Sequence, residues 1–178
     1  MRLIILFSFF VSFLYAQKTT YTITKKDNTE FLAKSYSSKT KYLQFTTINN
    51  KKIQIPYIEL DNIEVDYEKK VKRKIEKGKK ILKFIRISNR NGVLMKVLKE
   101  GKCNLYAHEF QYTHYYVLRK EEQIATPIYL KQILSNNFKK TAMQYFKDCD
   151  KVLKKIESKD FTKKNISEMI DFYNSNCE

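Results

Sequence analysis

The sequence predicts an α+β protein, with an antiparallel β-rich N-terminal and central part, arranged as a small barrel or a meander, and a C-terminal helical tail. Apolar and polar residues alternate from Thr20 to Tyr67, and the alternation resumes on both sides of a turn signal at Glu100-Gly101. From Phe138 onwards the apolar spacing becomes three and four residues, as in a helix. The 178 residues include only 3 Gly and 2 Pro, so we expect no flexible linker between these parts.

The first sixteen residues, MRLIILFSFFVSFLYA, have the layout of a secretory signal peptide. Arg2 precedes an apolar run from Leu3 to Leu14, and Ala16 is a small residue at which cleavage can occur. The run is too short for a transmembrane helix, which takes about 20 apolar residues. We therefore expect residues 1–16 to be removed and the protein to be exported to the periplasm, the cell surface or the medium.

Residues 17–67 are expected to form short strands joined by tight polar turns. Asp27-Asn28 and Asn49-Asn50 are turn signals, because Asn and Asp tolerate the backbone conformations of tight turns. Pro56 ends a strand because proline lacks the amide donor.

Residues 68–130 begin with a basic run that fits a helix or a strand. Glu68 to Arg86 contains ten cations and two acids, in a chain whose formal net charge is +16. Charge alone can hold anionic lipid headgroups, acidic polysaccharide or nucleic acid. The candidate polyanion contacts are Lys69, Lys70, Lys72, Arg73, Lys74, Lys77, Lys79 and Lys80. The alternative is a solvated face without function, and with 30 Lys against 5 Arg we do not expect sequence-specific nucleic-acid binding.

The clearest hairpin surrounds Glu100-Gly101, where the glycine is expected to supply the positive φ of a two-residue turn. Such a turn pairs Met95 with Tyr106. A ring then occupies every even position of the second strand and beyond, namely Tyr106, His108, Phe110, Tyr112, His114 and Tyr116. We interpret this row as the packed face of a sheet, beside Val93, Met95 and Val97 of the first strand. The alternative is an aromatic binding platform.

The sequence contains only two histidines, His108 and His114. On one straight strand they would lie about 20 Å apart, too far to share a metal ion. A hairpin between them would bring them together, with Glu109 nearby. We expect partly buried, hydrogen-bonded histidines, with no metal site and no cofactor.

The tail, residues 131–178, has three stretches of helical spacing, with Cys149 at the start of the second and Cys177 at the end of the third. If those two helices form an antiparallel hairpin, their outer ends meet. A Cys149–Cys177 disulfide would then close a loop of about 28 residues and stabilise the fold by on the order of 3–4 kcal/mol. Export favours such a bond, and Cys103 is left as a small buried hydrophobe.

Acidic residues crowd the stretch ELDNIEVDYE, in which Glu64 and Asp66 would share one face of a strand. These two are the acid pair that we can nominate for glycosidase-type chemistry. Ion pairing with Lys69 to Lys74 of the adjacent basic run is the simpler interpretation. Nucleophile elbows, phosphate loops and HExxH motifs do not occur, so we expect no catalytic residues and no enzyme.

The tail resembles the C-terminus of a family of small exported bacterial proteins of unknown function. The shared pattern consists of Asp148-Cys149, Phe161, Ile166, Met169-Ile170, Tyr173-Asn174 and Cys177, and the EGK-x-x-LY hairpin from Glu100 to Tyr106 resembles that family as well. The resemblance covers most of the mature chain and implies an envelope or secreted location. Its motifs are structural, and it implies no catalytic residues.

These features favour an exported, non-enzymatic binding or structural protein of the cell envelope. The candidate partner is an anionic envelope component, either a lipid headgroup or an acidic polysaccharide, held by the basic run. A hydrolase that acts on an envelope polymer is the alternative from a different class.

Overall fold

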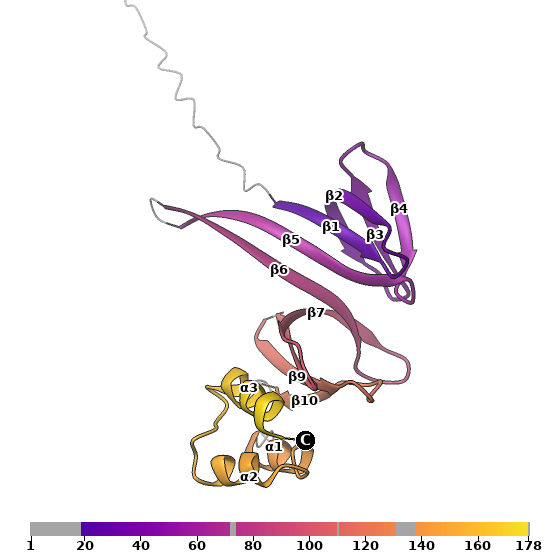
Figure 1. Cartoon of the computed structure of the whole chain (residues 1–178). Coiled ribbons are helices and arrows are strands. Elements are labelled where there is room, and N and C mark those ends of the chain that lie inside the picture. Colours follow the sequence, from indigo (N-terminus) through magenta and orange to yellow (C-terminus); the bar gives the residue numbers. More distant parts are fainter. Residues whose placement is uncertain (1–18, 72–73, 110, 131–137, 178) are drawn as a thin grey trace, which may run out of the picture.

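The computed structural model describes residues 19–71, 74–109, 111–130 and 138–177 (Figure 1). The expected signal peptide, residues 1–16, lies outside these ranges. Within them the strands are β1 (Thr19–Lys25), β2 (Glu30–Ser38), β3 (Tyr42–Thr47), β4 (Lys52–Pro56), β5 (Leu60–Val71), β6 (Lys74–Arg86), β7 (Gly92–Lys99), β8 (Cys103–Glu109), β9 (Thr113–Arg119) and β10 (Thr126–Tyr129). The helices are α1 (Phe138–Tyr145), α2 (Asp150–Glu157) and α3 (Ile166–Asn176). None of the helices that the structure describes is long and apolar enough to span a bilayer.

The strands form one antiparallel sheet with the order β10-β9-β8-β7-β6-β5-β1-β2-β3-β4. β1 pairs with both β2 and β5, so the long β5–β6 hairpin lies in the middle of the sheet. From β5 to β10 each strand pairs with the next in sequence, as in a meander. The α+β class and the β-rich body are confirmed. The described part of the sheet is open, with β4 and β10 at its edges, and it does not close into a barrel.

The basic segment forms a strand and not a helix. β5 pairs with β6 from Ile63–Leu82 out to Val71–Lys74, and this hairpin extends beyond the rest of the sheet as an arm (Figure 1). Leu82 and Ile85 are both buried, but they enter separate cores. The two side chains point to opposite faces, which the alternation of a strand provides.

The sheet has two faces, which we call the helix face and the outer face. At its N-terminal end the sheet curls toward the helix face around a core of Ile23, Ala33, Leu43, Phe45, Ile55, Tyr57, Leu60, Ile63, Val65 and Leu82. Tyr57, just after β4, stacks on Phe84 of β6 with ring centres 3.8 Å apart. Side chains therefore bring the edge of the sheet back against its centre.

The C-terminal half of the sheet curls toward the outer face. Ile85, Met95, Tyr106 and Ala125 form a separate core there. The amide of Ala125, just before β10, donates a hydrogen bond to the carbonyl of Arg86 at the end of β6 (2.8 Å). The two halves of the sheet thus curl in opposite directions from the shared strands β5 and β6.

We expected the row of rings to be packed in the core, and its first member, Tyr106, is. Tyr106 is 4% exposed. Phe110 lies outside the described residues, and Tyr112 is 42% exposed in the turn before β9. The register of the hairpin differs from the expected one by two residues, since Val97 and not Met95 pairs with Tyr106. A shift of two leaves the side chains on the expected faces.

The helices cover the helix face of the C-terminal half (Figure 1). The core between them and the sheet contains Cys103, Leu105, Val117 and Ile128 from the strand region, and Phe138, Ala142, Phe146, Cys149, Val152, Ile156, Phe161, Ile166, Met169, Ile170, Tyr173 and Cys177 from the tail. A disulfide joins Cys149 and Cys177, as the sequence predicts, and Cys103 is free and buried.

Gly101 lets the β7–β8 hairpin pack closely against α3. The side-chain oxygen of Asn174 accepts a hydrogen bond from the amide of Cys103 (2.8 Å), and its nitrogen donates to the Cys103 carbonyl (3.0 Å). A Cβ at Gly101 would lie 2.4 Å from the side-chain nitrogen of Asn174. Gly101 does not have a positive φ, so the expectation that the turn needs one is wrong. The glycine is needed there for space.

Replacing Tyr106 with alanine should lower the free energy of unfolding by about 3–5 kcal/mol, because a large buried ring is removed from the outer core. Chemical denaturation measures this loss. The matched control is Tyr112→Ala, for which we expect a smaller loss, about 1 kcal/mol, because this ring is 42% exposed and Tyr106 only 4%. Equal effects of the two substitutions would show that Tyr106 does not support the core.

Gly101 and Asn174 should be coupled in a double-mutant cycle. Gly101→Ala pushes the Asn174 amide off Cys103 and should cost about 1–3 kcal/mol, the range for leaving partly buried hydrogen-bonding groups unpaired. In an Asn174→Ala background the added methyl has room, and the cost should fall below about 0.5 kcal/mol. Additive effects of the two substitutions in urea denaturation would contradict this steric account.

Candidate ligand-binding groove

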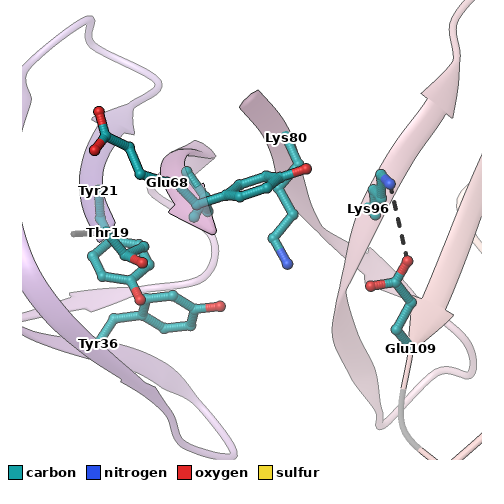
Figure 2. A pocket seen from close by; sticks show the side chains of 9 residues that line it. Thr19, Tyr21, Tyr36, Glu68, Lys80, Lys96 and Glu109 are labelled. Carbon is teal, nitrogen blue, oxygen red and sulfur yellow. Dashed lines mark ion pairs between the residues drawn. The ribbon is translucent and has the colours of Figure 1, made fainter. Parts of the chain in front are cut away.

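A groove of about 570 Å³ lies on the helix face between the two halves of the sheet (Figure 2). Its lining comprises Thr19, Tyr21, Tyr36, Val65, Tyr67, Glu68, Lys80, Lys96 and Glu109. Figure 2 shows Tyr21 and Tyr36 on one side, Lys96 and Glu109 on the other, and Lys80 between them. We call this hollow the tyrosine groove.

The register of the central strands brings these side chains together. Tyr21 of β1 pairs with Val65 of β5, which pairs with Lys80 of β6. One step along the same face, Leu82 of β6 pairs with Lys96 of β7. Directly opposed residues project from the same face of a sheet, so these rows form the floor of the groove.

Tyr67 lies over a gap that Gly78 leaves in β6. The two residues are cross-strand partners, and a Cβ at Gly78 would lie 2.3 Å from the hydroxyl oxygen of Tyr67. Glycine therefore lets the phenol ring lie across the neighbouring strand. Tyr67 remains 36% exposed, so part of its surface is open to a ligand.

Tyr21 and Tyr36 form the aromatic wall of the groove, with ring centres 5.1 Å apart in an edge-to-face arrangement. Burial, followed by the nearby Tyr21 and Tyr57, raises the pKa of Tyr36. Its hydroxyl is therefore protonated at neutral pH and can donate a hydrogen bond.

Two lysines, Lys80 and Lys96, and two acids, Glu68 and Glu109, line the groove. Glu68 is already paired with Lys77 (2.8 Å). Lys96 lies 4.0 Å from the carboxylate of Glu109, an exposed contact of little energetic weight. Among the described residues no acidic side chain forms an ion pair with Lys80. An open groove with phenol rings, hydroxyls and an unpaired ammonium can bind a hydroxyl-rich ligand that carries negative charge.

The acidic run and the basic run partly neutralise each other along the arm. Lys79 pairs with Glu64 (2.5 Å) and Lys77 pairs with Glu68 (2.8 Å). The acids thus pair with the basic run through Lys77 and Lys79, whereas the simpler interpretation expected pairing with Lys69 to Lys74. Asp66 lies directly opposite Lys79.

The structure distributes the eight candidate polyanion contacts over different surroundings. Lys72 and Arg73 lie outside the described residues, as do the side chains of Lys69 and Lys70. Lys74 is exposed on the arm. Lys77 and Lys79 are ion-paired, whereas Lys80 lines the tyrosine groove. The polyanion role of the run as a whole stays a prediction.

Sequence reasoning did not identify Tyr21, Tyr36, Lys96 or Glu109 as site residues. Each belongs to an ordinary alternating strand, and β1 and β7 are separated by β5 and β6 in the sheet. The pairing of β1 with β5 across more than forty residues of chain brings them near each other. Gly78, within the basic run, was the one signal in the sequence near the site. Its role opposite Tyr67 can be recognised only after β5 and β6 are paired.

The hairpin β8–β9 brings His108 and His114 together as cross-strand partners. Glu109 does not join them, because it points to the helix face and lines the groove. Within the residues that the structure describes, no group of three or more His, Cys, Asp or Glu side chains could hold a metal ion.

Comparisons of the chain with protein-family models, with curated proteins and with solved structures gave no match. The function of the groove is therefore argued from its side chains and their contacts. Its tyrosines and lysines are groups that bind ligands non-covalently.

Cys103 should be unreactive in the folded protein. Burial raises the pKa of its thiol to about 12, so the nucleophilic thiolate is scarce at neutral pH. Iodoacetamide in neutral buffer should leave the folded, non-reduced protein unlabelled and should modify one cysteine per chain in guanidinium. Mass spectrometry measures both, and rapid labelling of the native protein would show that the thiol is accessible.

Proposed function

We propose that this chain is an exported, non-enzymatic protein of the cell envelope that binds an acidic polysaccharide in the tyrosine groove. The observation that carries the proposal is the placement of two groups in one open hollow. Tyr67 offers a partly exposed ring held over Gly78, and Lys80 offers an ammonium with no ion-paired acid among the described residues.

The chemistry of the lining suits a charged sugar chain. A sugar ring has apolar C–H faces that pack on phenol rings, and tyrosine combines such a ring with a polar hydroxyl. Carboxylate or sulfate groups of the chain are attracted by Lys80 and Lys96. Lysine is a strongly hydrated point charge, which suits loosely positioned anions on a flexible polymer. The groove is open and polar, which favours a polysaccharide over a lipid headgroup anchored by its acyl chains.

Export is supported by the signal-peptide layout of residues 1–16 and by the Cys149–Cys177 disulfide. Disulfides persist in oxidising compartments such as the periplasm and the cell exterior. The resemblance of the tail to small exported bacterial proteins points the same way. An envelope location would also place the groove where acidic polysaccharides occur.

The two alternatives make different use of the arm. A hydrolase built on Glu64 and Asp66 would need both carboxylates to approach one bond, yet Glu64 is engaged by Lys79. A polyanion surface built on the whole basic run would use lysines that Glu64 and Glu68 already neutralise. Both contacts favour the groove as the ligand site.

Binding to heparin, used as a model acidic polysaccharide, should depend on the groove. Lys80→Gln with Lys96→Gln should weaken binding at low salt by about fivefold or more, since each lost ionic contact is worth up to about 1 kcal/mol. Tyr67→Ala should weaken it by a similar factor through lost ring contact. Calorimetry at low and high salt measures both effects, and the lysine effect should shrink at high salt.

The matched control is Lys79→Gln with Lys83→Gln, which removes the same charge from two ion-paired side chains of β6 that do not line the groove. This variant should bind heparin nearly as well as the native chain, and uncharged dextran should not bind. Equal losses in the two double variants would favour the basic run as a whole. Cleavage of an envelope polymer that Glu64→Gln abolishes would favour the hydrolase.

A further inference from the structure

A pair of histidines lies on the outer face, away from the tyrosine groove. His108 and His114 are direct partners in the β8–β9 hairpin, with ring centres 6.5 Å apart and planes inclined by 35°. The neighbouring pair on the same face is Tyr106–Tyr116. Glu109 projects to the helix face, where it lies near Lys96. The two imidazoles thus face each other without the carboxylate that adjoins them in sequence.

Both rings have the character of metal ligands. The Nδ1 atom of His114 is buried and has no hydrogen-bond partner among the described residues. Buried polar atoms normally have a partner, so this nitrogen is available for one. An imidazole nitrogen that carries no proton keeps the lone pair that a metal ion requires.

We propose that His108 and His114 together bind one late first-row transition-metal ion, with Cu²⁺ bound more tightly than Ni²⁺ or Zn²⁺. A ligating ring nitrogen lies about 2.0–2.1 Å from such an ion, so two rings on one ion have centres up to about 6.4 Å apart. The observed 6.5 Å lies just beyond this limit, so a side chain must rotate before both nitrogens reach the same ion.

Copper is expected to bind most tightly because affinity for nitrogen ligands peaks there along the first-row series. The strand pairing holds the two ligands in register, so little ordering is needed when the ion binds. Water fills the other coordination positions, since His108 and His114 are the two protein ligands of the site. This site does not rest on the function proposed for the groove, which lies on the other face.

The test uses the full chain without a histidine tag, titrated with CuCl₂, NiCl₂ and ZnCl₂ by calorimetry in a non-chelating buffer. We expect one Cu²⁺ per chain and weaker binding of the other two ions. His108→Gln or His114→Gln should each weaken Cu²⁺ binding by at least about tenfold, because loss of an outer-shell partner alone costs 10–100-fold. Glu109→Gln, the matched control on the helix face, should leave the affinity unchanged.

Electron paramagnetic resonance of the native Cu²⁺ complex supplies a readout that does not depend on whether a variant folds. Hyperfine structure from two imidazole nitrogens is expected. Coordination by oxygen alone, absence of Cu²⁺ binding, or equal binding by the doubly substituted chain would overturn the proposal. Circular dichroism of each variant shows whether a loss of affinity reflects unfolding. If a variant is unfolded, the electron paramagnetic resonance spectrum of the native Cu²⁺ complex tests the proposal instead.

Discussion

The pairing of β5 with β6 is the interaction on which the remaining structure depends. These long strands carry Leu82 into the N-terminal core on one face and Ile85 into the outer core on the other. They also oppose Glu64 and Glu68 to Lys79 and Lys77, which reduces the repulsion within a very basic segment. Because the halves of the sheet curl in opposite directions from this hairpin, the helix face is left uncovered between them, and the tyrosine groove lies there.

The helical tail is attached to this sheet by polar contacts as well as by its core. The Arg119 guanidinium donates to Asp148 (2.5 Å) and to the carbonyl of Tyr145 (2.8 Å), and the hydroxyl of Tyr173 donates to the other oxygen of Asp148 (2.7 Å). Asn174 reaches the backbone of Cys103 at the start of β8. The disulfide then joins residues that flank α2 and α3. Helices as short as these need such anchors, because isolated short helices are marginal in water.

The Glu100-Gly101 hairpin and the C-terminal helix α3 depend on each other through these contacts. The Glu100-Gly101 hairpin and the Tyr173-Asn174 dipeptide are far apart in sequence but touch in the fold, since Gly101 leaves room for the Asn174 amide. Lys102 extends the same contact by donating to the carbonyl of Cys177 (2.6 Å). Each of these two segments is therefore a structural requirement of the other.

Local pattern was enough to predict the class, the helical tail, the Cys149–Cys177 bond and the burial of Tyr106. Period, turn signals and helix ends are properties of neighbouring residues. The β5–β6 arm was ambiguous, because a lysine-rich segment with scattered apolar residues fits two periods. The turn at Gly101 was misread, because the atom that demands a glycine belongs to a helix more than seventy residues away.

The sequence by itself therefore determined the structure of most segments, though not of the basic arm, and the burial of side chains such as Tyr106. Only the tertiary structure decided which strands are neighbours, and through them the composition of the groove and the meeting of His108 with His114. The physical reason is that alternation specifies the face on which a side chain lies but not the partner across the sheet. Pairing between distant strands is selected by the fit of whole cores. A candidate site that draws side chains from six strands is therefore formed only when that fit is made.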